Sequence, residues 1–248
     1  MTNQAKAILK RAARGFGVEI SRVPRLFDGS AYQPVRPLAS YSPWNTDTAF
    51  RSAYASVGAF TLVDAYRCFE LWKLVEQAAK LERGSFIEIG VWRGGTGALI
   101  ATQAKRCGNR DKVFLCDTFT GVVKAGAKDS QYRGGEHADT DRQTVERLIA
   151  EMGLDNVEIL QGVFPEDTGP RVQDVQFRFC HIDVDVYQSA KDIVDWIWHK
   201  LVPGGIVVYD DYGFPGCVGI TRYVEEQTLC GDRILIHNLN GHAVVIKR

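Results

Sequence analysis

The sequence predicts an α/β protein with a doubly wound, mostly parallel, seven-stranded sheet. From residue 61 onward, short apolar segments alternate with amphipathic segments of helical length, a pattern typical of a parallel sheet covered by helices on both faces. The last two apolar segments follow one another without a helix between them, which favours an antiparallel hairpin at the edge of the sheet. A chain of 248 residues, 45% of them hydrophobic, is long enough to bury one sizeable core.

Residues 1–60 differ in texture from the rest, and we interpret them as an N-terminal arm or lid. Residues 3–14 predict a short basic helix, whereas 21–45 are rich in Pro, Ser and Tyr and predict a loop. A basic amphipathic helix can lie on a membrane surface. The apolar face of this one is mostly alanine, so a solvated or packing arm is favoured over membrane binding.

Residues 61–248 are expected to form the main domain, and the first half of it contains two strand–helix units. Apolar residues at helical spacing predict a helix over 61–82, with Leu62, Phe69, Trp72 and Val75 on its buried side. Apolar runs predict strands at 85–90 and 112–117, separated by a helix at 94–106. A long polar loop over 118–138 follows the second strand.

The second half of the domain continues the alternation. The segment 139–153 begins with Asp and Thr and ends with Gly, which predicts a helix. Apolar runs predict strands at 157–162, 177–183 and 205–211, and an amphipathic helix over 187–201 is expected to stop at Pro203-Gly204-Gly205. A helix near 217–228 precedes the closing hairpin of 232–239 and 242–248.

Acidic residues stand at the carboxyl ends of four of the five predicted parallel strands, which is where ligands bind in such sheets. A single acid at a strand end can equally cap the following helix. Four such ends together favour a functional site. The strand ends are Glu88–Gly90, Asp117, Gln161–Gly162, Asp183 with Asp185, and Asp210 with Asp211.

The turn after the first strand is glycine-rich but is not a dinucleotide fingerprint. Trp92 occupies the place of the middle glycine of G-x-G-x-x-G, where a backbone must approach a pyrophosphate. Asp117 ends the next strand 20 residues after Gly97, where an acid can bind ribose hydroxyls. A nucleoside cofactor without a pyrophosphate satisfies both facts, and S-adenosylmethionine is the candidate. The glycines alone are also compatible with close helix–sheet packing.

Asp183, Asp210 and Asp211 are expected to converge, because the fourth and fifth strands should be neighbours or near-neighbours. Three close carboxylates repel one another unless a proton or a cation neutralises them. An all-oxygen set suits Mg²⁺. The structural alternatives are an N-cap role for Asp210 and Asp211 and a loop-bracing role for Asp183.

The balance of charges and the cysteines bear on partners and compartment. Thirty basic and 30 acidic residues give a net charge of zero, so the electrostatic argument for nucleic-acid binding is missing. The mean hydropathy is −0.16, and no apolar run approaches 18 residues. We therefore expect no membrane-spanning helix. Six scattered cysteines without a C-x-x-C pair are typical of free thiols, and we expect a cytoplasmic protein. A homo-oligomer is possible.

Five segments together resemble the macrocin O-methyltransferase family of class I, Rossmann-like, S-adenosylmethionine-dependent methyltransferases, which methylate sugar or phenol hydroxyls of antibiotics. The resemblance spans residues 60–230 and is sharpest in the first and last two motifs. The motifs are EIGVWRGGTGAL (88–99), CDTFTGV (116–122), LQGVFPEDTG (160–169), HIDVDVYQSA (181–190) and LVPGGIVVYDDYG (201–213).

The resemblance implies S-adenosylmethionine as methyl donor and Mg²⁺ at the hydroxyl of a small-molecule acceptor. It implies that Asp183, Asp210 and Asp211 bind the metal and that Asp185 is the general base. The implied cofactor residues are Glu88, Gly90, Val91 and Trp92 along methionine and ribose, Asp117 on the ribose diol, and Gly162 and Val163 at the adenine.

The chain departs from the family pattern at Val184, Val186 and Ala190, and residues 121–138 lack the usual Leu-Pro. The acceptor is therefore not specified. Two other functions remain open from the residues: another metal-dependent enzyme on the same fold, and a non-catalytic nucleoside-binding or scaffold protein. Asp185 could also cap the helix that begins near Tyr187.

Overall fold

The computed structural model describes residues 3–18, 20, 29–35 and 39–248. The chain divides into two compact units, residues 1–38 and residues 39–248. The first contains the helix α1 (Asn3–Gly15), which confirms the predicted basic helix and exposes Ile8 and Leu9. The parts of the predicted loop at 21–28 and 36–38 lie outside the described residues.

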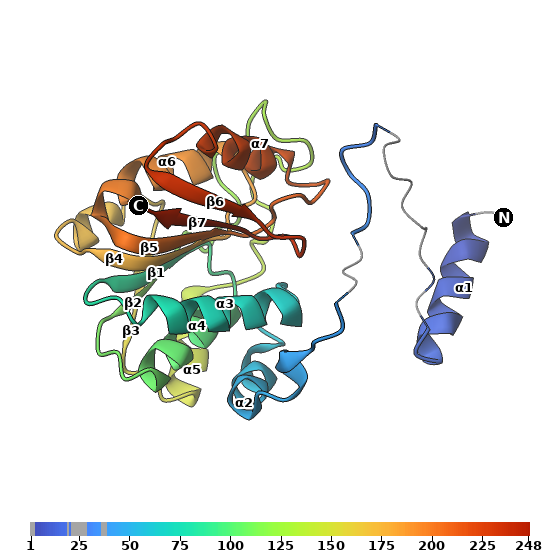
Figure 1. The fold of residues 1–248 in the computed structure, drawn as a ribbon, viewed down its shortest axis with the longest axis horizontal. Coiled ribbons are helices and arrows are strands. Elements are labelled where there is room, and N and C mark those ends of the chain that lie inside the picture. Colours follow the sequence, from blue (N-terminus) through green and yellow to red (C-terminus); the bar gives the residue numbers. More distant parts are fainter. Residues whose placement is uncertain (1–2, 19, 21–28, 36–38) are drawn as a thin grey trace. The chain divides into compact units, whose positions relative to one another are not determined.

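The second unit is built on one sheet of seven strands in the order β3-β2-β1-β4-β5-β7-β6, shown in Figure 1. The five strands from β3 to β5 are parallel, and β7 runs antiparallel to β5 and β6. This confirms the predicted doubly wound sheet and its closing hairpin. The strands are β1 (Ser85–Ile89), β2 (Val113–Asp117), β3 (Val157–Gln161), β4 (Phe177–Ile182), β5 (Leu201–Tyr209), β6 (Arg233–His237) and β7 (Ala243–Lys247).

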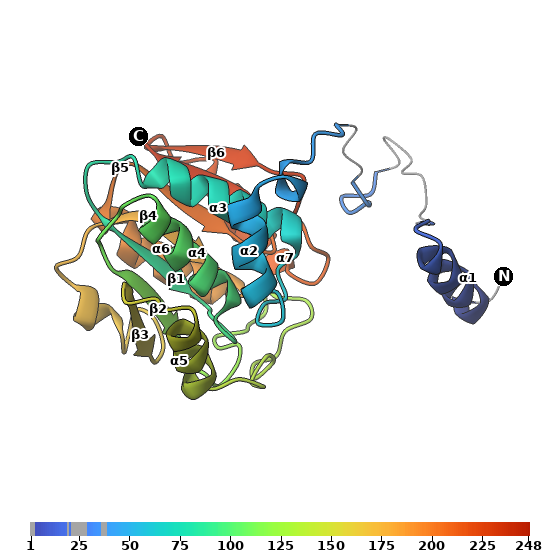
Figure 2. The same ribbon diagram turned by 90° about the horizontal axis from the view of Figure 1, so that it is seen from below.

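Helices cover both faces of the sheet (Figures 1 and 2). One face carries α3 (Ala65–Ala78), α4 (Gly95–Arg106) and α5 (Arg142–Glu151), and the other carries α6 (Tyr187–Ile197) and α7 (Val218–Gln227). Asp141 caps α5 by accepting a hydrogen bond from the Thr144 N–H at 2.7 Å, so the helix begins later than the predicted residue 139. Short 3₁₀ turns lie at Pro43–Asn45, Gly169–Val172 and Trp198–Lys200.

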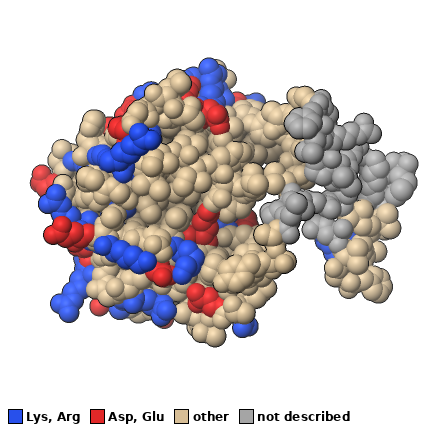
Figure 3. Space-filling model, viewed as in Figure 1, with Lys and Arg blue, Asp and Glu red and all other residues tan. Residues whose placement is uncertain are grey.

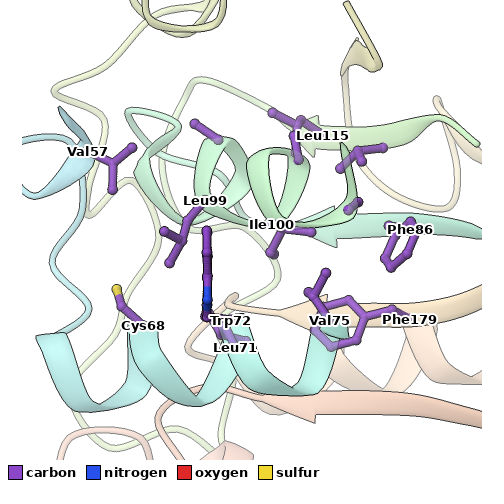
Figure 4. Close-up of a cluster of buried hydrophobic side chains, with 14 of the residues drawn as sticks. Val57, Cys68, Leu71, Trp72, Val75, Phe86, Leu99, Ile100, Leu115 and Phe179 are labelled. Atoms are coloured by element: carbon purple, nitrogen blue, oxygen red, sulfur yellow. The ribbon is translucent and has the colours of Figure 1, made fainter. Parts of the chain in front are cut away.

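Residues 39–60 pack with the main unit, although the sequence grouped them with the arm. They contain a helix that the sequence analysis missed, α2 (Thr48–Val57), which packs against α3 and α4. Phe50, Ala53 and Val57 are buried there. Figure 4 shows Val57 beside the cluster in which Trp72 of α3 projects toward Leu99 of α4. The apolar spacing in α2 joins these residues to the same core.

Two local expectations were wrong. Leu62 is 64% exposed and precedes α3, because the helix starts only at Ala65, after its N-cap Asp64. Residues 201–205 do not form a turn ahead of the fifth strand. The helix α6 ends at Ile197, and β5 already begins at Leu201, with an irregular register against β4 that accommodates Pro203 and the two glycines.

Among the described residues, the helices are too short or too polar to cross a membrane. On the face shown in Figure 3, basic and acidic side chains are interspersed. That face has no extensive surface of one sign, which is consistent with the balanced net charge.

Candidate active site

A cavity of about 220 Å³ lies at the carboxyl ends of the parallel strands. A single water needs only about 10–15 Å³ by this type of measure, so the cavity is large enough for a small molecule. The start of α3 and the loop 118–138 contribute to its wall. Ten of the predicted site residues line it: Gly90, Val91, Trp92, Asp117, Gly162, Val163, Asp183, Asp185, Asp210 and Asp211.

The first turn requires glycine at position 90 because the ends of β1 and β4 nearly touch there. Gly90 has a φ of +86°, and a Cβ atom on it would lie 1.7 Å from the Asp183 carbonyl oxygen. The following residues, Val91 and Trp92, present their backbone N–H groups at the head of α4. Glycine at position 90 therefore serves the close packing of these two strand ends.

Asp117 holds that turn together. Its Oδ2 accepts hydrogen bonds from the Val91 and Trp92 N–H groups at 2.6 and 2.8 Å, and its Oδ1 accepts one from Phe119 at 2.7 Å. Each carboxylate oxygen has two lone pairs, so capacity remains for a ribose hydroxyl. Asp117 thus has a turn-organising function that the sequence analysis did not foresee, and its bond to ribose stays a prediction.

Glu88 is placed differently from the expectation. It is fully buried beneath the turn and is not among the residues that line the cavity. Its Oε1 lies 2.8 Å from His181 Nδ1, and its Oε2 has no hydrogen-bond partner. His181 is likewise fully buried. A direct contact between Glu88 and a cofactor remains a prediction.

Gly162 and Val163 form the cavity wall after β3. The Gly162 N–H donates to the Asp117 carbonyl oxygen at 2.9 Å, which ties the ends of β2 and β3. The Val163 N–H donates to Asp167 Oδ2 at 2.8 Å. Both residues border the cavity at the side where the sequence predicts adenine.

The sheet brings three carboxylates together as predicted. The backbone ladder continues past the strand ends, since Asp183 N–H donates to Ile89 O and Asp210 N–H donates to Ile182 O, both at 2.9 Å. Carboxylate oxygens of Asp183, Asp210 and Asp211 lie within 4.8 Å of one another. The adjacent strands β4 and β5 therefore create the cluster.

The three acids are not equivalent electrostatically. Burial, then the charges of Asp210 and its neighbours, raise the pKa values of Asp183 and Asp211 well above the usual range. Burial alone would also raise the pKa of Asp210. The adjacent imidazoles His181 and His242 and the Arg67 guanidinium instead hold it below its usual range.

Arg67 is a cation in the site that the sequence analysis missed. It lies on α3 with a side chain only 8% exposed, and its Nη1 donates to Asp210 Oδ2. The same nitrogen is 3.7 Å from Asp211 Oδ1. One guanidinium cannot balance the carboxylates around it, as the raised pKa values of Asp183 and Asp211 indicate.

Asp185 reaches the cavity by a route that strand alternation did not predict. The strand β4 ends at Ile182, and Asp185 adopts a left-handed φ of +63°. One oxygen of its carboxylate lies 3.9 Å from Cys217 Sγ. Burial raises its pKa.

The helix-cap alternative for Asp185 is wrong. The N-cap of α6 is Val186, which makes no side-chain cap. The Tyr187 N–H donates instead to Asp129 Oδ1 at 2.9 Å, from the loop 118–138.

Comparison with known proteins agrees with this geometry. The sequence model of the macrocin O-methyltransferase (TylF) family matches residues 42–243. The chain belongs to this family. The match covers the strands β1 to β6 and the acidic cluster, and it ends at the first residue of β7.

Two curated relatives are each 31% identical to the chain. One is the 8-demethyl-8-(2,3-dimethoxy-α-L-rhamnosyl)-tetracenomycin-C 4′-O-methyltransferase of Streptomyces olivaceus, over 64% of this chain and 65% of the relative. The other is the mycinamicin III 3″-O-methyltransferase of Micromonospora griseorubida, over 64% and 67%. The chain thus matches about two thirds of the length of these relatives.

Among solved structures, the O-methyltransferase NovP is similar, with a TM-score of 0.67 and 24% sequence identity. The similarity covers 76% of this chain and 82% of the NovP chain. The calicheamicin methyltransferase CalS11 has a TM-score of 0.60 at 17% identity, over 91% and 99%. These likenesses confirm the class I methyltransferase fold.

Sequence reasoning missed several residues of this family site besides Arg67. Tyr132 and His137 line the cavity from the loop 118–138, with ring centroids 6.0 Å apart. His242, just before β7, lies 2.7 Å from Asp210. The available signal was weak, because a histidine in a loop or near a hairpin is more often solvated.

The residues present fit a divalent cation. The donors are carboxylate oxygens, which are the ligands that Mg²⁺ prefers. Burial and then the neighbouring carboxylates raise the pKa values of Asp183 and Asp211, and a bound cation would offset the repulsion among them. Asp183, Asp210 and Asp211 are the residues that would hold such an ion.

Proposed function

We propose that this chain is an S-adenosylmethionine-dependent O-methyltransferase that uses Mg²⁺ and methylates a hydroxyl of a small natural product. The observation that supports this most is one cavity that joins two features. The glycine turn at Gly90–Trp92, held by Asp117, and the Asp183–Asp210–Asp211 cluster both line it. A cofactor turn beside a cation site is what methyl transfer to a hydroxyl needs.

The cofactor part of the proposal assigns S-adenosylmethionine to the β1–β2–β3 side. Val91 and Trp92 would line methionine and ribose, Asp117 would bind the ribose diol, and Gly162 and Val163 would border adenine. Glu88 would act from beneath the turn. Solved relatives described as bound to S-adenosylhomocysteine or S-adenosylmethionine support this assignment, since they share the fold.

The chemical part of the proposal assigns the cation to Asp183, Asp210 and Asp211. It assigns to Asp185 the removal of the proton from the acceptor hydroxyl. When bound, Mg²⁺ supplies a Lewis acid that lowers the pKa of an acceptor hydroxyl. An ordinary carboxylate is too weak a base for an unactivated hydroxyl. The burial that raises the pKa of Asp185 makes it a better proton acceptor.

The relatives support a sugar or phenol acceptor. One of them is named for methylation of a rhamnosyl tetracenomycin, and another is named for methylation of mycinamicin III. A third, 25% identical over 76% of this chain, is the demethyldecarbamoylnovobiocin O-methyltransferase of Streptomyces niveus. A small hydroxylated molecule fits a cavity of this size. The proposal includes neither nucleic acid nor membrane as partner and places the protein in the cytoplasm.

The test is methyl transfer from labelled S-adenosylmethionine to a panel of glycosylated and phenolic acceptors, with Mg²⁺ or with excess EDTA. We expect product by mass spectrometry with Mg²⁺ and none with EDTA. Asp210→Asn should lose activity and recover part of it only at higher Mg²⁺. Binding of S-adenosylmethionine without transfer to any acceptor would favour the nucleoside-binding scaffold. Full activity in EDTA would remove the metal from the mechanism.

A further inference from the structure

Asp210 is the most firmly held carboxylate of the acidic cluster. Its Oδ2 accepts a hydrogen bond from Arg67 Nη1, and its Oδ1 lies 2.7 Å from His242 Nε2. Asp210 is only 3% exposed. Two hydrogen bonds on opposite oxygens fix both the position and the rotation of a carboxylate.

His242 is itself held from both edges of its ring. The residue is fully buried just before β7, and its Nδ1 lies 2.7 Å from Glu70 Oε2 on α3. Glu70 also accepts hydrogen bonds from Asn238 and Asn240 in the connection between β6 and β7. The ring therefore cannot turn away from Asp210 without breaking its bond to Glu70.

A second imidazole near Asp210 does not make the same contact. His181 Nε2 is 3.9 Å from Asp210 Oδ1, which is too long for a hydrogen bond, and its Nδ1 faces Glu88. His242 is thus the imidazole that reaches Asp210 within hydrogen-bond distance.

We propose that His242 is a positioning residue that holds the Asp210 carboxylate in the orientation required for the cation. The proposal rests on the proposed Mg²⁺ site. Mg²⁺ demands near-ideal octahedral geometry, so a freely rotating carboxylate is a poor ligand. Groups that hydrogen-bond metal ligands typically change metal affinity or activity about 10- to 100-fold when they are mutated.

Two substitutions of His242 separate its two hydrogen bonds. In His242→Gln the amide nitrogen lies near the place of Nε2 and keeps a donor toward Asp210. In His242→Asn the amide nitrogen lies near the place of Nδ1 and keeps only the bond to Glu70. The matched control is Asn238→Ala, which removes a Glu70 contact within the same hairpin but leaves both imidazole bonds in place.

The experiment measures Mg²⁺ binding to the full-length protein by calorimetry, with circular dichroism and S-adenosylhomocysteine binding as checks on the fold. We expect His242→Asn to weaken Mg²⁺ binding by about 10- to 100-fold, with His242→Gln and Asn238→Ala close to the wild type. S-adenosylhomocysteine affinity should be the same in all four proteins.

Other outcomes overturn the proposal. Wild-type Mg²⁺ affinity in His242→Asn refutes the positioning role while the metal site stands. Equal weakening in His242→Asn and His242→Gln, or weakening in Asn238→Ala, shows that packing rather than the bond to Asp210 is responsible. A wild-type protein that binds no Mg²⁺ refutes the metal site itself, and the positioning role with it.

Discussion

Asp117 gives the most direct test of the cofactor side, because it organises the turn and is also predicted to bind the ribose. It accepts hydrogen bonds from Val91, Trp92 and Phe119 at 2.6, 2.8 and 2.7 Å, and it is predicted to bind the ribose diol. Asp117→Ala removes all of these. Asp117→Asn keeps one amide oxygen but turns an NH₂ group toward backbone donors on the other side.

The expected magnitudes follow from the geometry. A hydrogen bond to a charged group contributes about 1.5–3 kcal/mol, so loss of the ribose contact should weaken cofactor binding by roughly 10- to 150-fold. Asp117 is half-buried, and water can replace part of the three backbone contacts. We therefore expect the free energy of unfolding to fall by about 2–4 kcal/mol, which lowers Tm by roughly 5–15 °C in a chain of this size.

The assay combines calorimetry with S-adenosylhomocysteine and thermal unfolding followed by circular dichroism. The control is Asp141→Ala, which removes the N-cap of α5 at a residue outside the cavity lining. It should cost about 1 kcal/mol of stability without changing cofactor affinity. A wild-type dissociation constant in Asp117→Ala would refute the ribose assignment, and preferential binding of NADH would refute the whole cofactor assignment.

Three further predictions address the acceptor side and the frame of the site. Asp185→Asn should lower kcat by about 10²–10⁴-fold without changing S-adenosylhomocysteine affinity, and a near-wild-type rate would contradict its role as base. Gly90→Ala should prevent folding, seen as loss of soluble protein, because its Cβ would lie 1.7 Å from Asp183 O. The control Gly108→Ala, at a φ of +75° with open space around it, should cost only about 1–2 kcal/mol, so equal losses would contradict the steric argument. Chelation by EDTA should abolish methyl transfer while Tm stays nearly constant, since Mg²⁺ seldom holds a domain together; a large fall in Tm would show that the cation is structural.

The sequence could predict the fold and the place of the acidic cluster because both follow from local rules. Alternating strands and helices imply a parallel sheet, and a parallel sheet puts the ends of β4 and β5 at one edge. Asp183 and Asp210 then had to meet, and they do. Their roles as metal ligands are implied by the resemblance to the family and remain predictions.

The sequence could not predict contacts that join distant elements without a local pattern. Arg67 lies in an amphipathic helix among apolar residues and binds Asp210, 143 positions later. His242 pairs with Glu70 across 172 positions. The left-handed backbone of Asp185 breaks strand alternation, so the side of the sheet it faces could not be read from period two. The helix α2 was missed because it is short and follows a segment with the composition of a loop.

The loop 118–138 bears on how an acceptor is chosen. Ser189 Oγ of α6 donates to the Val123 carbonyl oxygen at 2.9 Å, and the Tyr187 N–H donates to Asp129 Oδ1 at 2.9 Å. The loop is thus tied to one helix at two separate points before it presents Tyr132 to Asp185. A wall held in this way does not need to be ordered when a ligand enters, which lowers the entropic cost of binding. We therefore expect selection among acceptors to depend on the shape and the hydrogen-bonding groups of this wall, where the chain lacks the Leu-Pro usual in its family.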